Sequence, residues 1–228
     1  MPDNTTKTKE RKLYKYLRTG LKSDRGNTKW KIEKWKKVRG KPSICNKGFH
    51  ASQKPLQALQ YVGGEILAEV MVRGDSVIQD DKECWSEMKI VRAWHWTKKD
   101  SVELAIFSAE QVIDIFEKEY PKDKQPREAI ESAKQYLKTG KSGGNDAAYA
   151  AYTAYAIYAV YSANAANAAA AAYAAYATAA TAATYYVDDY AYHVTKAASA
   201  ASAPDKKEFT KKLNAWYTRK IKKLTPYD

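Results

Sequence analysis

Residues 65–96, EILAEVMVRGDSVIQDDKECWSEMKIVRAWHW, carry the strongest fold signal in the chain. EILAEVMV, at 65–72, has the composition of a β-strand, and Arg73–Asp75 has the composition of a turn. EMKIVRAWHW, at 87–96, alternates apolar and polar residues and predicts the next strand. We therefore expect a mostly antiparallel sheet built around this segment.

The neighbouring segments extend the expected sheet domain over residues 11–120, after a flexible tail at 1–10. Short extended stretches between residues 12 and 38 place apolar side chains among lysines, which predicts a sheet with one solvated face. A helix is expected from Asp100 or Ser101, either of which can cap it, to Tyr120. The expected fold of this part is a small α+β domain.

The rest of the chain is dominated by alanine and tyrosine. Residues 121–145 are expected to be a linker with a connecting helix, PREAIESAKQYLKTG, that Gly140 closes. Residues 147–203 contain 28 alanines and 11 tyrosines, and alanine is the best helix former. We expect an all-α, alanine- and tyrosine-rich bundle over residues 146–228. A row of tyrosines spaced three apart winds around its helix and is a candidate protein contact: Tyr149, Tyr152, Tyr155, Tyr158 and Tyr161.

The charge is strongly positive and unevenly distributed. The chain has a net charge of +13, and residues 1–60 carry 17 Lys and Arg against 4 Asp and Glu. Such a field attracts polyanions, and tryptophans among cations can stack on bases. The alternative is a solvated face with its tryptophans in the core. The candidate nucleic-acid-binding residues are Lys29, Trp30, Lys31, Lys34, Trp35, Lys36, Lys37, Arg39 and Lys41.

Two parts of the chain resemble known families. The first resemblance is carried by Cys45, Gly48–Ala51, Pro55–Leu56, Tyr61, Ala68–Val70, Gly74, Asp81–Lys82 and Ile90–Arg92. This pattern resembles an uncharacterised family that is frequent in phages and prophages. PREAIESAKQYLKTG and the alanine repeats resemble helical modules of phage accessory proteins and of a bacterial immunity-protein family. The resemblances imply conflict between mobile elements and hosts, and imply no reaction.

An enzymatic alternative uses three residues near the phage-like motif. In an ADP-ribosyl-transfer site, His50 would bind the nicotinamide ribose, Tyr61 would stack on the ring, and Glu69, or Glu65, would stabilise the oxocarbenium ion. The competing interpretation is that His50 bonds the backbone, Tyr61 is in the core and Glu69 faces water. A zinc site from Cys45, His50, Cys84 and His95 is conceivable, but its spacing does not match a zinc knuckle. We expect no metal and no cofactor.

The function expected from the sequence is non-enzymatic. We expect a phage or prophage accessory protein that binds a host nucleic acid or nucleoprotein, such as an inhibitor of an RNA-guided nuclease. An immunity-type or structural protein-binding module is an alternative. The polar start of the chain, MPDNTTKTKERK, indicates the cytoplasm of the host cell, and no membrane partner is expected. Cys45 and Cys84 are then expected as thiols.

Overall fold

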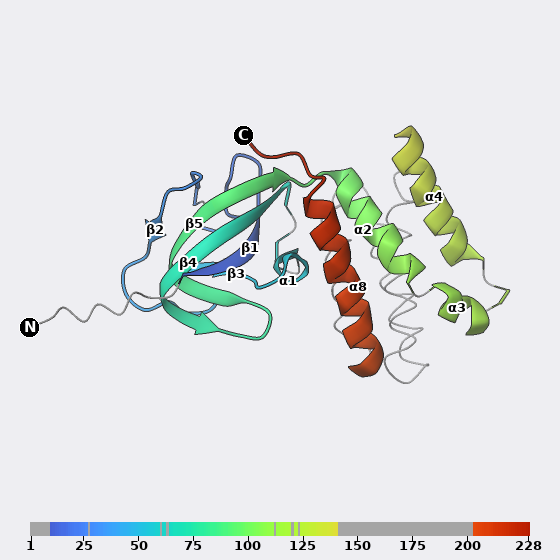
Figure 1. Ribbon diagram of the computed structural model, residues 1–228, viewed down its shortest axis with the longest axis horizontal. Helices are drawn as coiled ribbons and strands as arrows, with labels where there is room; N and C mark the ends of the chain where they lie inside the picture. The colour runs from blue at the N-terminus through green and yellow to red at the C-terminus, as the bar shows by residue number, and fades with distance from the viewer. Residues whose placement is uncertain are drawn as a thin grey trace, which may run out of the picture. The chain divides into compact units, whose positions relative to one another are not determined.

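The computed structural model describes residues 10–140 and 203–228, except Asn27, Gln60, Gly63, Val112, Tyr120 and Asp123. The chain divides into two units, Met1–His95 with Lys220–Asp228, and Trp96–Arg219. We call them the sheet unit and the helical unit. Their described elements, drawn in Figure 1, are β1 (Arg11–Leu17), β2 (Lys36–Lys37), β3 (Phe49–Ala51), α1 (Pro55–Leu59), β4 (Ile66–Ile78), β5 (Glu83–His95), α2 (Lys98–Glu110), α3 (Ile113–Glu119), α4 (Gln125–Thr139) and α8 (Ala203–Ile221).

The β4–β5 hairpin is the centre of the sheet unit. The two strands pair antiparallel over their full length of 13 residues each. The turn expected at Arg73–Asp75 is wrong, because β4 continues through this point and the chain reverses only after Ile78. Gly74 has a φ of +84°, which glycine adopts without strain, and the register shifts there as in a β-bulge. Glycine and aspartate therefore bend the strand and do not end it.

The strands close into a ring. β1 pairs with β4, and both β2 and β3 pair with β5, in a five-stranded antiparallel sheet. Directly after β3, Ser52 exchanges two backbone hydrogen bonds with Tyr14 of β1, at 2.8 and 2.9 Å. Each of β1, β4, β5 and β3 thus has a neighbour on both sides for part of its length, and the ring encloses the core.

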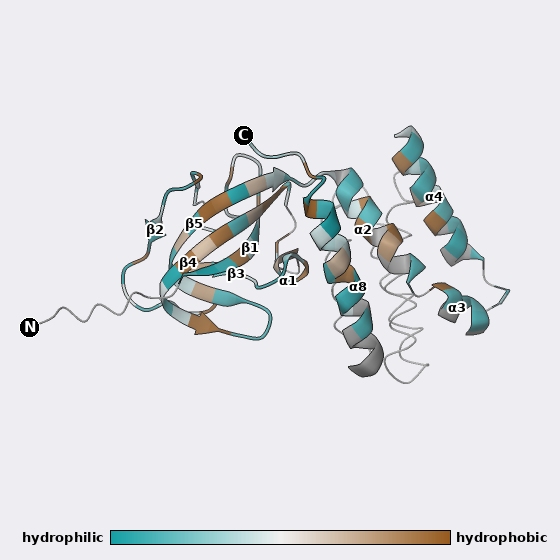
Figure 2. Cartoon of the chain, viewed as in Figure 1, coloured by the Kyte–Doolittle hydropathy of each residue, from teal (hydrophilic) through white to brown (hydrophobic). Residues whose placement is uncertain are grey.

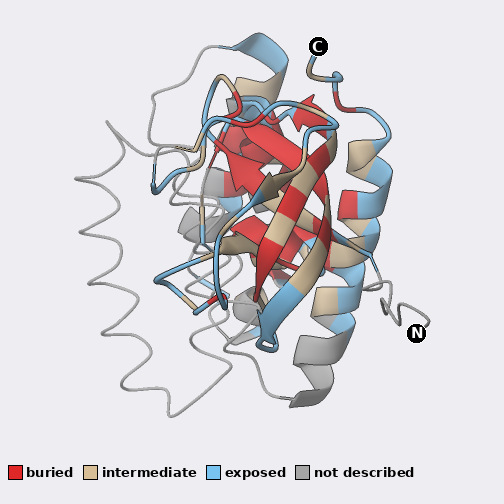
Figure 3. Cartoon of the chain, turned by 90° about the vertical axis from the view of Figure 1, so that its left-hand side faces the viewer, coloured by how far each residue is buried: buried red, intermediate tan, exposed pale blue. Residues whose placement is uncertain are grey.

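The core of the sheet unit consists of inward-facing residues of these strands. In β1 the buried residues are Leu13, Tyr16 and Leu17, and the more exposed Tyr14 and Lys15 lie between them. Figure 2 shows hydrophobic residues along β4 and β5, and Figure 3 shows these strands buried over much of their length and exposed at the turn end of β4. The cluster comprises Leu13, Leu17, Leu21, Trp30, Ala51, Ile66, Ala68, Val70, Val72, Trp85, Met88, Ile90 and Ala93.

The end of the chain joins this sheet. His95 donates its backbone N–H to the carbonyl of Thr225 at 2.9 Å, and the N–H of Tyr227 donates to Ala93 at 3.0 Å. The expected all-α bundle over residues 146–228 is therefore wrong, since the described end of that range, after α8, is extended and pairs with β5. Pro226, between the two hydrogen-bonded positions, has no N–H with which to continue a helix.

The helical unit begins with a capping box. Thr97 stands before α2, and the Asp100 carboxylate accepts a hydrogen bond from the Thr97 N–H at 2.6 Å. The cap is therefore Thr97, one turn before the expected start. The single helix expected to Tyr120 is wrong, because α2 ends at Glu110 and α3 begins at Ile113. The end of α4 is as expected, with Gly140 left-handed and its N–H bonded to the Tyr136 carbonyl at 2.8 Å.

Aromatic rings and a few buried aliphatic residues hold the described part of the helical unit. Trp96 stacks on the buried Tyr217 of α8 with ring centroids 5.5 Å apart, and Phe107 of α2 stacks on Trp216 at 6.0 Å. The described buried apolar residues of α2, α3 and α4 are Val102, Leu104, Ile106, Ile113, Ile130 and Ala133. None of the described helices combines the length and the hydropathy that a membrane crossing requires.

Candidate functional site

The two tryptophans of residues 29–41, Trp30 and Trp35, differ in how far they are buried. Trp30 is 2% exposed, donates its indole N–H to Ser23 Oγ at 2.9 Å and packs edge-on against Phe49. Trp35 is half-buried, and the Arg73 guanidinium lies 4.0 Å from its ring centroid. Trp30 is therefore a core residue with no ring face for a base, and one face of Trp35 already holds a cation.

The seven cations of residues 29–41 fall into two groups according to their side-chain contacts. Lys36 lies over the Trp30 ring at 6.0 Å, and Lys37 pairs with Glu87 at 3.0 Å. Hydrogen bonds from Arg73 and Lys37 lower the pKa of Glu87. The other five cations are exposed, and none of them forms an ion pair with another described residue. We call these five the basic loop: Lys29, Lys31, Lys34, Arg39 and Lys41.

His50 of β3 lies beneath the loop that precedes it. Its Nε2 atom accepts the backbone N–H of Cys45 at 3.0 Å, and its carbonyl accepts a hydrogen bond from Lys15 Nζ at 2.9 Å. Burial lowers the pKa of His50, and the nearby charges of Lys15 and Lys82 lower it further. The imidazole is thus kept neutral, with its acceptor nitrogen occupied by the backbone.

The competing interpretation is wrong for Tyr61 and Glu69, because Tyr61 is 44% exposed and Glu69 only 5% exposed, and both side chains have partners. The Tyr61 hydroxyl donates to the Asp81 carboxylate, and Lys82 Nζ lies 4.5 Å from the ring centroid. Burial and this hydrogen bond raise the pKa of Tyr61. Glu69 is held by Arg92 at 3.1 Å and by Lys12 at 3.3 Å. Glu65 accepts the backbone N–H of Thr19 at 2.8 Å. Lys82 is a common neighbour of His50 and Tyr61, whereas no contact between described residues joins Glu69 to either.

Three of the four conceivable zinc ligands are neighbours, since His50 pairs with Cys84 across β3 and β5 and its Nε2 accepts the Cys45 N–H. The buried Cys84 thiol contacts the carbonyl of Lys47 at 3.2 Å, and the exposed Cys45 lies 3.6 Å from Lys82 Nζ. His95 packs against Tyr227 with ring centroids 4.9 Å apart. Within the described ranges no three His, Cys, Asp or Glu side chains are arranged to hold a metal ion.

Sequence reasoning missed two polar groups of the sheet unit, the half-buried Lys15 and the buried Glu83. Lys15 lies on the inward side of β1 between Leu13 and Leu17, and burial lowers its pKa to about 8. Glu83 is fully buried. Its carboxylate accepts hydrogen bonds from Trp85 and Gln53 and forms an ion pair with Arg11. The alternation of β1 was a usable signal for Lys15, since residues 13, 15 and 17 share a face.

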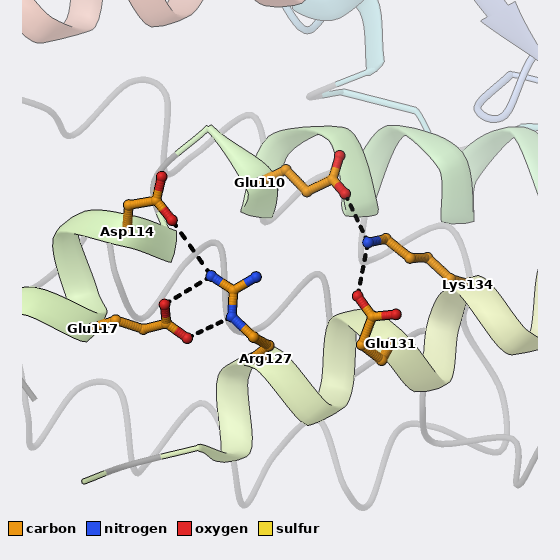
Figure 4. Close-up of polar contacts among 6 residues, drawn as sticks. All are labelled: Glu110, Asp114, Glu117, Arg127, Glu131 and Lys134. Carbon is orange, nitrogen blue, oxygen red and sulfur yellow. Dashed lines mark hydrogen bonds and ion pairs between the residues drawn. The ribbon is translucent and has the colours of Figure 1, made fainter. Parts of the chain in front are cut away.

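The helical unit carries a surface network of charges (Figure 4). Arg127 of α4 binds Glu117 of α3 through two hydrogen bonds of 2.5 and 2.7 Å, and lies 3.4 Å from Asp114. Lys134 bridges Glu110 and Glu131 at 3.0 and 2.7 Å. These pairs tie α4 to α2 and α3 on the surface. The candidate protein contact at Tyr149, Tyr152, Tyr155, Tyr158 and Tyr161 lies outside the described residues.

Comparison with protein families divides the chain close to the point where the two units meet in sequence. A domain of unknown function (DUF7666) matches residues 11–99. The family described as Imm-5 like putative immunity protein matches residues 95–226, more than half of the chain. The chain therefore belongs to this immunity-protein family. No curated protein and no solved structure matches it.

Proposed function

We propose that this chain is an immunity-type protein, which protects a cell by binding a harmful partner protein and not by catalysing a reaction. The observation that carries the proposal is the family match over residues 95–226. We also propose that it acts in the cytoplasm of the host cell, in the setting of phage or prophage conflict. That setting rests on the sequence motif between Cys45 and Arg92.

The contacts of the candidate catalytic residues support binding without turnover. A general base or a ribose ligand must offer an unoccupied atom to the substrate. In this protein His50 Nε2 accepts from Cys45, the Tyr61 hydroxyl bonds Asp81, and Glu69 is paired with Arg92. Incubation with labelled NAD and host extract should therefore release no nicotinamide, and release would favour the ADP-ribosyl-transfer alternative.

Affinity capture from host cells tests the proposal. The tagged full chain is recovered from lysate with and without treatment by RNase and DNase. An immunity-type protein should retain the same protein partner in both arms, at a constant ratio to the chain. Expression of that partner alone should slow growth, and co-expression of the chain should restore it. A partner whose expression leaves growth unchanged would count against the immunity role.

A second candidate function is binding to a nucleic acid or a host nucleoprotein, such as an RNA-guided nuclease. The basic loop favours it, because five exposed cations without ion pairs to other described residues lie within 13 positions of sequence. Binding to phosphates releases counterions, so affinity should fall steeply as salt rises. The readout is fluorescence anisotropy of labelled single-stranded RNA and DNA between about 50 and 200 mM salt.

A matched pair of variants makes this second test specific. Lys31→Glu/Lys34→Glu/Arg39→Glu reverses three cations of the basic loop and should reduce the salt slope by about 2. Lys122→Glu/Lys212→Glu/Arg219→Glu makes the same change of charge at three exposed positions of the helical unit. Equal losses in both variants would indicate attraction by net charge alone and would exclude the basic loop as the site.

A further inference from the structure

The turn end of the β4–β5 hairpin is acidic, although the chain as a whole is strongly basic. Residues 74–81, GDSVIQDD, contain three aspartates and no cation, in a chain with a net charge of +13. Asp75 and Asp80 are exposed, and neither forms an ion pair with another described residue. This end of the hairpin is therefore an acidic island.

The same stretch is an exposed strand edge. On the side that faces β1, pairing of β4 ends at Val72, opposite Arg11, and beyond that point β5 on the other side is its one partner among the described strands. Every residue from Asp75 to Asp80 is exposed, as the pale blue turn end of the hairpin in Figure 3 shows. Unpaired strand edges are templates for an added strand. We call Asp75–Asp80 the acidic edge.

The hydrogen-bond pattern identifies the backbone groups that face outward. Gln79 donates its N–H to the Lys82 carbonyl at 2.9 Å, so residues 79 and 82 form a hydrogen-bonded pair. Bonded and non-bonded pairs alternate along an antiparallel ladder. The pair of Val77 with Cys84 is then bonded, and the N–H and C=O groups of Ser76 and Ile78 point away from β5. Because Ser76 and Ile78 are two residues apart, an added strand could form backbone hydrogen bonds with both of them.

The side chains of the acidic edge define what such a strand must carry. Val77 and Ile78 are 38% and 52% exposed, and they are two of the three large hydrophobic residues exposed among the described residues. Because side chains alternate along a strand, Val77 lies on one face and Ile78 on the other, while Asp75 lies at the bulge and Asp80 in the turn. Each face of an added strand would therefore meet one aliphatic side chain, and each end of it would meet a carboxylate.

We propose that the acidic edge is a strand-addition site for an extended, basic segment of a partner protein. Aliphatic residues of that segment pack beside Val77 and Ile78, and cations at its ends pair with Asp75 and Asp80. Backbone hydrogen bonds to Ser76 and Ile78 hold the segment in register. The site requires neither the immunity role nor the basic loop, so it can be tested apart from both.

Synthetic peptides provide the probe. The capped peptide KTVVTK places valines opposite residues 77 and 78 and lysines opposite 75 and 80, and it reads the same in both directions. ETVVTE differs only in charge. Titration of each labelled peptide with the full chain, up to about 1 mM protein, should give at least about tenfold tighter binding of KTVVTK. Equal binding, or no binding of KTVVTK, would overturn the proposal.

Variants of the protein in which the charge of the acidic edge is reversed give the decisive test. Asp75→Lys/Asp80→Lys alters two exposed residues, so the fold should survive, and the preference should reverse in favour of ETVVTE. Asp114→Lys/Asp228→Lys makes the same change of charge at other exposed positions and should leave the preference unchanged. Loss of the preference in this control would overturn the site.

Two other occupants are distinguishable. A dimer of the full chain that Asp75→Lys/Asp80→Lys alters, seen by analytical ultracentrifugation, would assign the edge to a second copy. Stronger KTVVTK binding in Lys7→Glu/Lys9→Glu would assign it to the chain's own N-terminal segment. Either result would overturn the proposal of a partner strand.

Discussion

The sheet unit and the helical unit are stabilised in different ways. The sheet unit encloses 13 buried apolar residues within a ring of paired strands, and several of its largest side chains are less than 2% exposed. In the described helical unit fewer aliphatic residues are buried, and ion pairs on the surface join α4 to α2 and α3. Buried apolar area contributes far more to stability than exposed ion pairs do. Substitutions in the sheet core should therefore have the larger effects.

The largest effect is expected from Trp30→Ala. The ring is 2% exposed and its indole N–H bonds Ser23, so its removal leaves a cavity and an unpaired hydroxyl partner. We expect the free energy of unfolding, from urea titration, to fall by about 3–5 kcal/mol. Trp35→Ala removes a half-buried ring and should cost less than about 2 kcal/mol. Equal losses would contradict the assignment of Trp30 to the core.

Gly48→Ala should have the next largest effect. Gly48 has a φ of +121°, and a Cβ atom there would lie 2.5 Å from Cys84 Sγ. Strain and overlap together should lower the free energy of unfolding by about 2–4 kcal/mol. Gly20 has a φ of +75° with no atom within 4 Å of the added Cβ, so Gly20→Ala isolates the backbone cost of about 1 kcal/mol. A Gly48 variant no less stable than the Gly20 variant would contradict the packing around Cys84.

Lys15→Met tests a charge inside the sheet. The pKa of Lys15 is lowered from 10.5 to about 8, so between these values the unfolded chain binds more protons than the folded one. Wild-type stability should therefore rise as the pH rises from about 8 to about 10.5. The variant should lose that rise and should be more stable at neutral pH by about 1–2 kcal/mol.

Lys12→Met is the control for this experiment, since Lys12 lies on the same strand and is exposed beside Glu69. It should keep the alkaline rise of the wild type. Urea titrations at several pH values give the comparison. A wild-type free energy of unfolding that stays constant over the interval would show that Lys15 is not desolvated.

Arg127→Gln should have the smallest effect. Its hydrogen bonds lower the pKa of Glu117 from the ordinary 4.5, so this pair stabilises the fold above that pH and the contribution is lost as the pH falls. A small decrease of the melting temperature is expected at neutral pH and low salt, with none in about 1 M salt. Lys138→Gln removes an exposed cation of the same helix and is the control. A large decrease that salt does not reduce would contradict a surface role.

The contrast between the units also explains what the sequence predicted. The strand composition of residues 65–72, the alternation of residues 87–96 and the punctuation of α4 by Pro126 and Gly140 are local signals, and the structure confirms these elements. The pairing of Tyr14 with Ser52 and of Thr225 with His95 depends on distant parts of the chain, so no local pattern predicts it. The expected turn at Gly74 failed because glycine serves a bulge as well as a turn.

The candidate site was predictable only in part. Trp30 and Trp35 have similar neighbours in sequence, yet one is in the core and one lies under Arg73. The burial of each ring depends on residues distant in sequence that pack against it, Phe49 for Trp30 and Arg73 for Trp35. The exposed cations of the basic loop were predictable, because lysine is rarely buried. The acidic edge was not predicted, since its exposure depends on where β1 stops pairing with β4.

The most direct test of the central claim is the growth of host cells that express the captured partner, with and without this chain. The account predicts that the partner alone slows growth and that equal expression of the chain restores it, with a stable complex recovered after nuclease treatment. A partner that leaves growth unchanged, or a complex that nuclease dissolves, would contradict the immunity role.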